Sequence, residues 1–162
     1  MPQSEKLLEV KNLRTSFFTA EGEVKAVDDI SYYVDEGEII AIVGESGCGK
    51  SVAQMSLVRL IQTPPGRILG GQVLLEGRDL MQYKPKSKEL RRMRGEGISM
   101  IFQEPMTSLN HVLTIGDQLS EVIRVHAGVN RAEARKRGVS ALEAVGIPEP
   151  ATRMLSYPFE MS

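Results

Sequence analysis

The sequence predicts an α/β fold in which strands come first, a strand, a loop and a helix follow, and a helical region ends the chain. Three observations support this order. Apolar and polar residues alternate in the first part, at the period of a half-buried strand; the apolar positions are Leu8, Val10, Ile30, Tyr32 and Val34. A continuous apolar run at residues 39–43 stands directly before a glycine-rich loop. Beyond residue 115, apolar residues recur at helical spacing.

The central unit begins with residues 39–43, which are apolar on both faces and suit a strand in the middle of a parallel sheet. Before it, a turn at residues 20–23 is expected to separate the N-terminal strands. After the loop, apolar residues at i, i+4, i+7 and i+8 predict a helix; they are Ala53, Leu57, Leu60 and Ile61. The Thr-Pro-Pro-Gly sequence at residues 63–66 ends this helix.

Short elements and then two helices are expected in the second half. The short elements are a strand at residues 73–76, a turn at 77–79, a polar helix within 85–94, and an apolar strand at 98–102 that joins the central sheet. The helices are marked by two apolar stripes, Leu119, Val122, Ile123 and His126, then Ala134, Gly138, Ala141, Leu142 and Val145. Asn130 and Glu133 resemble a capping box before the second helix, and Gly146 with Pro148 ends it.

Composition excludes several classes of protein. The chain has 162 residues, 41% hydrophobic and 25% charged, which is enough for one domain with an apolar core. A formal net charge of −1 argues against a nucleic-acid binder that depends on a large positive field. The single cysteine excludes an intramolecular disulfide and a multi-cysteine zinc site. Residues 1–10 lack a secretory signal, and the run at 39–43 is far shorter than the ~20 residues of a membrane helix, so a cytoplasmic protein is expected.

The loop matches the pattern G-x-x-x-x-G-K-[ST] in full. Its residues are Gly44, Glu45, Ser46, Gly47, Cys48, Gly49, Lys50 and Ser51. Glycines let backbone N–H groups converge on phosphates, and the N-terminus of the following helix adds partial positive charge. Lys50 is placed to reach the β- and γ-phosphates, and the Ser51 hydroxyl to ligate Mg²⁺. A chance match has a probability of roughly half a percent, so the sequence predicts a nucleoside triphosphate site, for ATP with Mg²⁺.

Two other chemistries fit this region less well. Residues 44–47 begin like the G-x-S-x-G elbow of a hydrolase, but Cys48 replaces the final glycine. A GTPase would need an N/T-K-x-D guanine motif, which the sequence lacks. Cys48 itself is interpreted as a small residue that fits a tight loop.

Several stretches resemble the ATP-binding subunits of ABC transporters, within them the dipeptide, oligopeptide and nickel importer group. The matching stretches are residues 26–31, 44–51, 100–110, 113–118 and 156–158. The stretch at 100–110, Met-Ile-Phe-Gln-Glu-Pro-Met-Thr-Ser-Leu-Asn, is the most characteristic. The resemblance implies an ABC-type P-loop NTPase core with an N-terminal antiparallel β subdomain, together about residues 1–105, and an α-helical subdomain at about 106–162.

The resemblance also assigns roles to two residues outside the loop. Gln103 falls at the family's Q-loop glutamine, which contacts Mg²⁺ and the region of the attacking water, and Lys50 and Gln103 are the candidate catalytic residues. Phe17 falls where the family has an aromatic residue that stacks on adenine. Phe18 is the alternative for this role, because strand alternation directs one of the two side chains into the core.

The sequence departs from the family in a few places. His111, Phe159 and Met161 stand where proline, histidine and leucine are expected. The signature motif of the family should begin at Met161 and Ser162, so the sequence is expected to be the N-terminal portion of a longer protein. Residues 1–162 alone are therefore expected to bind ATP and to hydrolyse little of it.

The resemblance implies an importer ATPase that couples ATP binding and hydrolysis to uptake of peptides, or of nickel. Its expected partners are a second ATPase subunit, transmembrane permease subunits and, indirectly, an extracytoplasmic substrate-binding protein; no nucleic acid is expected. Its expected place is the cytoplasmic face of the membrane, held by the permease. Two alternatives stay open: a non-hydrolysing nucleotide-binding regulatory module, and another soluble P-loop enzyme.

Two basic clusters accompany these motifs. One is Lys88, Arg91, Arg92 and Arg94, and the other is Arg131, Arg135, Lys136 and Arg137. Such clusters are usually solvated helix faces, and the alternative is docking to the channel or to anionic lipid headgroups.

Overall fold

The structure, a computed structural model, describes residues 6–104 and 108–161. The expectations that fall on residues 105–107 and on Ser162 lie outside the described residues. The chain divides into two compact units, Met1–Ile98 and Ser99–Ser162, and each is described by itself.

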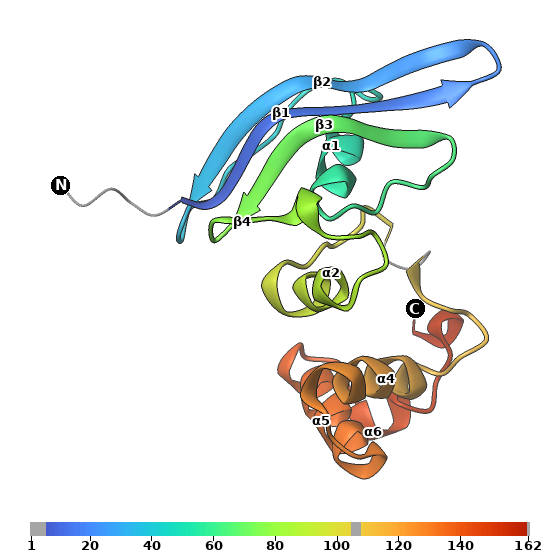
Figure 1. The fold of residues 1–162 in the computed structure, drawn as a ribbon. Coiled ribbons are helices and arrows are strands. Elements are labelled where there is room, and N and C mark those ends of the chain that lie inside the picture. Colours follow the sequence, from blue (N-terminus) through green and yellow to red (C-terminus); the bar gives the residue numbers. More distant parts are fainter. Residues whose placement is uncertain (1–5, 105–107, 162) are drawn as a thin grey trace. The chain divides into compact units, whose positions relative to one another are not determined.

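The first unit is built on a four-stranded antiparallel sheet with the strand order β2-β1-β3-β4 (Figure 1). The strands are β1 (Lys6–Thr19), β2 (Gly22–Asp35), β3 (Gly66–Leu75) and β4 (Arg78–Asp79). The predicted N-terminal strands and the antiparallel β subdomain are thereby confirmed. The predicted turn at 77–79 is displaced, because Glu76 and Gly77 take the positive φ angles of 48° and 75° and Arg78 already pairs with Leu75.

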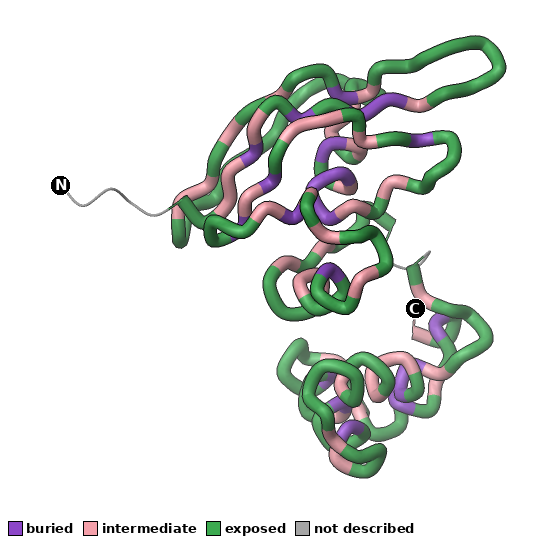
Figure 2. The backbone as a smooth tube through the Cα atoms, viewed as in Figure 1, coloured by how far each residue is buried: buried purple, intermediate pink, exposed green. Residues whose placement is uncertain are grey.

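Helix α1 (Lys50–Leu57) packs on this sheet and completes its core (Figure 1). The core joins apolar side chains of the strands to Ala53 and Leu57 of the helix; the strand residues include Val10, Leu13, Val27, Val73 and Leu75. One polar contact lies inside this core, where the hydroxyls of Thr15 and Ser56 share a hydrogen bond of 2.9 Å. Figure 2 shows buried positions along the strands and an exposed turn between β1 and β2.

The expected helix over Ala53 to Ile61 is too long, because α1 ends at Leu57. Arg59 takes a left-handed φ of 53°, and the N–H groups of Arg59 and Leu60 donate to the carbonyls of Ser56 (3.1 Å) and Met55 (2.8 Å). These two bonds form a Schellman motif, which closes a helix at its C-terminal end. Leu60 and Ile61, which continue the helical spacing of apolar residues, therefore lie outside the helix.

The two apolar runs predicted as strands are not strands, which corrects the expectation at residues 39–43 and at 98–102. Ile39 is 97% exposed, Val43 is 87% exposed and Ile101 is 91% exposed. A strand needs neighbours that accept and donate its backbone hydrogen bonds. Within residues 6–104 and 108–161, no strand pairs with either run.

The rest of the first unit is short helical structure after β4. The elements are a 3₁₀ turn at Leu80–Gln82, helix α2 (Lys88–Arg92), and a π turn at Met93–Gly97. Ser87 caps α2 by accepting from the backbone N–H of Leu90 at 3.2 Å. The helix expected within 85–94 is confirmed.

The second unit is helical, as expected, and its described part contains α4 (Ile115–Ala127), α5 (Arg131–Ala144), α6 (Pro150–Arg153) and a 3₁₀ turn at Pro158–Glu160. Asn130 caps α5 by accepting from the N–H of Glu133 at 2.9 Å, but the Glu133 carboxylate accepts from Arg137 at 2.8 Å instead of returning to the cap. Met154 is fully buried between Gly116 and Gly138. In the described part of the chain, no helix has the length and apolar character needed to cross a membrane.

Candidate functional site

The glycine-rich loop is pressed against the sheet at its last glycine. Gly49 is the N-cap of α1 with a φ of 92°, and its carbonyl accepts from the N–H of Ala53 at 2.8 Å. A Cβ atom at this position would lie 2.0 Å from the carbonyl oxygen of Ala26 on β2. Only glycine has both the backbone freedom and the missing side chain that this contact requires.

Small residues also shape the start of the loop. A Cβ atom at Gly44 would lie 2.7 Å from the Sγ of Cys48, so the chain folds closely over itself here. Gly47 has a φ of 81° and open space around it. Cys48 is exposed, and its thiol lies at the surface of the loop. Because the N-cap is a glycine, no capping side chain covers the first backbone N–H groups of α1.

The ammonium group of Lys50 lies over the loop. It donates to the carbonyl oxygens of Gly44 at 2.7 Å and Glu45 at 2.6 Å, and to the Cys48 sulfur at 3.4 Å. Among the described residues, no carboxylate forms an ion pair with it. The Lys50 ammonium is therefore bound by neutral polar groups of the loop, and an anionic oxygen can replace them because it accepts a stronger hydrogen bond.

The other predicted site residues are exposed or half-buried. Ser51 is exposed at the start of α1, and Gln103 is exposed in the second unit. Phe17 is half-buried on β1 beside Gly66, whereas Phe18 is 39% exposed under the guanidinium of Arg67, which lies 5.2 Å from the ring centroid. The roles assigned to Gln103, Phe17 and Phe18 stay predictions.

The residues at the loop fit magnesium only together with a phosphate ligand. No group of three or more His, Cys, Asp or Glu side chains that could hold a metal ion occurs in the described part of the chain. The Ser51 hydroxyl supplies one oxygen, and Mg²⁺ requires six in near-octahedral geometry. Phosphate oxygens and water would have to supply the others.

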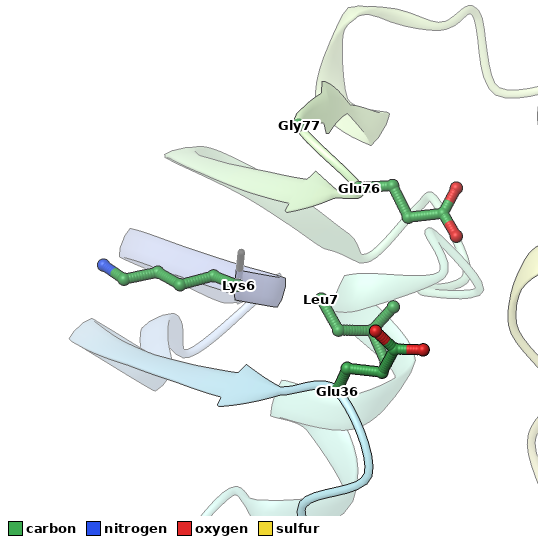
Figure 3. A pocket seen from close by; sticks show the side chains of 5 residues that line it. All are labelled: Lys6, Leu7, Glu36, Glu76 and Gly77. Carbon is green, nitrogen blue, oxygen red and sulfur yellow. The ribbon is translucent and has the colours of Figure 1, made fainter. Parts of the chain in front are cut away.

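A separate hollow of about 530 Å³ lies at one end of the sheet (Figure 3). The carboxylates of Glu36 and Glu76 lie on one side of it, while Lys6 extends to the other side and pairs with Glu9 at 2.6 Å. Two carboxylates would repel an anion, so this hollow is no phosphate site.

Sequence reasoning found the loop but missed the carbonyl of Ala26 against which it packs. Nothing in the sequence marks a backbone oxygen as the reason for a glycine 23 positions later. It named Arg94 only as part of a basic cluster and missed that this side chain bonds the carbonyls of Val58 and Arg59 at the C-terminal end of α1.

The family model described as "ABC transporter" matches residues 27–162. The chain belongs to the ABC transporter family. The predicted family and its α/β fold are confirmed, and the match includes the loop and Gln103.

The curated relatives that the chain resembles are ATP-binding proteins described for peptide transport. The oligopeptide transport ATP-binding protein OppD of Bacillus subtilis (strain 168) is 46% identical over 157 residues, which cover 97% of this chain and 43% of that protein. The dipeptide transport ATP-binding protein DppD of the same organism is 46% identical over 158 residues, which cover 98% of this chain and 47% of that protein. The probable peptide ABC transporter ATP-binding protein y4tR of Sinorhizobium fredii is 41% identical over 161 residues, 99% of this chain and 48% of that protein. The chain thus spans slightly less than half the length of these relatives.

Solved structures agree on the fold. The dimeric structure of MJ0796, a bacterial ABC transporter cassette, matches with a TM-score of 0.78 at 22% identity, covering 96% of this chain and 63% of that chain. A second structure of that cassette, described as a post-hydrolysis state bound to ADP and Pi, matches with the same TM-score and coverage.

Proposed function

We propose that the loop at residues 44–51 binds the triphosphate of ATP together with Mg²⁺. The observation that carries this proposal is the position of the Lys50 ammonium, 2.7 and 2.6 Å from the carbonyls of Gly44 and Glu45, over a loop whose glycines leave the first N–H groups of α1 uncovered. Backbone N–H groups, a helix N-terminus and one ammonium together form a site for a polyphosphate. Membership of the ABC transporter family supports ATP as the ligand.

Each residue has a distinct task in this proposal. Lys50 exchanges its carbonyl partners for oxygens of the β- and γ-phosphates, and Ser51 donates its hydroxyl oxygen to Mg²⁺. Gln103 takes, by the resemblance to the family, the role of the residue that orients water, for which its amide is suited because it both donates and accepts. Bound ATP supplies the phosphoryl group whose transfer to water releases free energy.

The protein as a whole is proposed to be the ATPase subunit of an ABC importer for peptides. The relatives named for oligopeptide and dipeptide transport support this substrate class, and nickel is the alternative. The proposed partners are a second ATPase subunit, permease subunits that hold the protein at the cytoplasmic face of the membrane, and an external binding protein that acts through the permease. The dimeric structure of the MJ0796 cassette supports the second subunit.

Calorimetric titration with MgATP tests the proposed site. Lys50→Ala is expected to weaken binding by about ten- to a hundredfold, because a hydrogen bond to a charged group is worth about 1.5–3 kcal/mol. Lys88→Ala, which removes an exposed lysine on α2, is the matched control and should bind like the unchanged protein. Equal affinity in both variants would contradict the assignment.

The rate of ATP hydrolysis separates the proposed importer ATPase from the alternative of a non-hydrolysing regulatory module. A regulatory module would bind MgATP without hydrolysing it even in its full assembly, whereas an importer ATPase hydrolyses ATP when joined to its permease. For residues 1–162 by themselves, we propose binding with little turnover, and phosphate release at the rate of a working transporter would refute this.

A further inference from the structure

A cationic cavity lies at the C-terminal end of α1, and its volume is about 610 Å³. Four of its lining residues carry positive charge: Arg59, Arg67, Lys86 and Arg94. No lining residue is acidic, and the remaining wall is largely apolar, with Leu60, Ile61 and Ile68. The side chains that line this cavity thus carry net positive charge, whereas those of the hollow with Glu36, Glu76 and Lys6 carry net negative charge.

Two of the four cations are held in place by backbone carbonyls. Arg94 donates from Nε to the carbonyl of Val58 and from Nη2 to the carbonyl of Arg59, both at 2.7 Å. Arg59 donates from Nη1 to the carbonyls of Met81 and Tyr83. A guanidinium has five N–H donors, so each of these two side chains keeps donors beyond these bonds while its position is already set.

Backbone carbonyls and one aromatic ring, but no acidic side chain of the described residues, offset the positive charge of this cavity. In residues 6–104 and 108–161, none of the four cations forms an ion pair with a carboxylate. Burial, and then the neighbouring charge of Arg59, lower the pKa of Arg94 below its usual range. Arg67 is held over the ring of Phe18 rather than over an acid. An anion would relieve the repulsion between Arg59 and Arg94.

We propose that this cavity binds an organic phosphate, with the phosphate on the cations and the apolar part of the ligand against Leu60, Ile61 and Ile68. Guanidinium groups match the paired oxygens of a phosphate, and four positive charges match a dianion better than a single carboxylate. The ligand is a soluble phosphate ester or the headgroup of an anionic lipid, which share this chemistry.

The cavity is separate from the phosphate loop. The loop lies at the N-terminal end of α1 and the cavity at its C-terminal end, and an eight-residue helix is about 12 Å long. The inference therefore does not rest on nucleotide binding at Lys50, and either proposal can fail without the other.

Protection of Lys86 from acetylation tests the inference in the unchanged protein. Lys86 and Lys88 are both exposed and two residues apart, and only Lys86 lines the cavity, so Lys88 is the internal control. The probe is phenyl phosphate, which joins a phosphate to an apolar ring. At a concentration of about ten times its Kd, mass action predicts that Lys86 reacts about tenfold more slowly while Lys88 reacts at the same rate. Mass spectrometry of the digested protein measures both rates.

A parallel experiment with vesicles identifies the source of the phosphate. Protection of Lys86 by phenyl phosphate supports a soluble ester; protection by vesicles of phosphatidylglycerol, but not by phenyl phosphate or phosphatidylcholine vesicles, supports a lipid headgroup. Protection by none of these, or equal protection of Lys86 and Lys88, overturns the inference.

Two arginine substitutions provide an independent measurement. Arg67→Gln removes one cavity cation without disturbing the carbonyl bonds of Arg59 and Arg94, and it should raise the Kd for the protecting ligand about tenfold. Arg91→Gln on α2, outside the cavity lining, should leave the Kd unchanged. Equal Kd values for the two variants would also overturn the inference.

Discussion

Replacing Gly49 by alanine tests how tightly the glycine-rich loop at residues 44–51 is pressed against the sheet. The new Cβ would lie 2.0 Å from the carbonyl oxygen of Ala26, whereas Cβ contacts below 3.0 Å are essentially not found in proteins. The loop and the start of α1 must therefore move away from β2 by about 1 Å, the difference between these two distances. Such overpacking costs about 1–3 kcal/mol, and the φ of 92° adds about 1–3 kcal/mol for a residue with a side chain.

A second glycine separates the two costs. Gly37 has a φ of 74°, and a Cβ built on it has no atom within 4 Å. Gly37→Ala therefore introduces the strain of a left-handed backbone angle but no steric clash. Both substitutions change the entropy of the unfolded chain in the same way, and that contribution cancels in the comparison. The extra loss of stability in Gly49→Ala is then the cost of the contact with Ala26, expected at about 1–3 kcal/mol.

Urea unfolding at 25 °C measures this difference as a shift of the midpoint at unchanged m value. Calorimetric titration with MgATP should show weaker binding as well, since the displaced backbone N–H groups of the loop and the N-terminus of α1 would no longer converge on the phosphates. If Gly49→Ala is no less stable than Gly37→Ala, the close packing of the loop on Ala26 is refuted.

Three further predictions concern other contacts. Ser56→Ala should cost about 1–3 kcal/mol of unfolding free energy because it leaves the buried Thr15 hydroxyl without its partner, and the double variant with Thr15→Val should cost less than the two single changes added together in urea unfolding. Saturating MgATP should protect the exposed thiol of Cys48 from alkylation, and equal labelling with and without nucleotide would contradict this. The hydrogen bond from Arg137 lowers the pKa of Glu133 from its ordinary value near 4.5, so this pair stabilises the fold above pH 4.5 and less as the pH falls through the lowered pKa; Arg137→Gln should flatten the acid side of the stability profile.

The parts of the fold that could be predicted from the sequence are those decided by neighbouring residues. Alternating residues mark β1 and β2 because side chains of a strand alternate between its two faces. The asparagine cap of α5 was predictable because its bond reaches only three residues along the chain, to Glu133. The loop before α1 was predictable for the same reason, since its glycines, lysine and serine stand in one short motif, and its binding of phosphate stays a proposal.

The end of α1 could not be predicted, because it depends on contacts between distant residues. Leu60 continues the apolar spacing of the helix, but Arg59 turns the chain in the left-handed conformation, for which arginine gives no signal. Arg94 then bonds the carbonyls of Val58 and Arg59 from 36 and 35 positions away. Neither the length of the helix nor the cationic cavity can be inferred from residues that lie so far apart in the sequence.

The failed prediction at residues 39–43 has a different physical cause. An apolar run on both faces reports that the side chains favour burial, and burial is one requirement of a central strand. Backbone pairing is the other requirement, and within the described residues nothing supplies it, so Ile39 and Val43 stay exposed at 97% and 87%. The run leads directly into Gly44 of the phosphate loop. Gly49 holds the other end of that loop against Ala26 and α1, and the Lys50 ammonium reaches back from α1 to the carbonyls of Gly44 and Glu45 at the start of the loop.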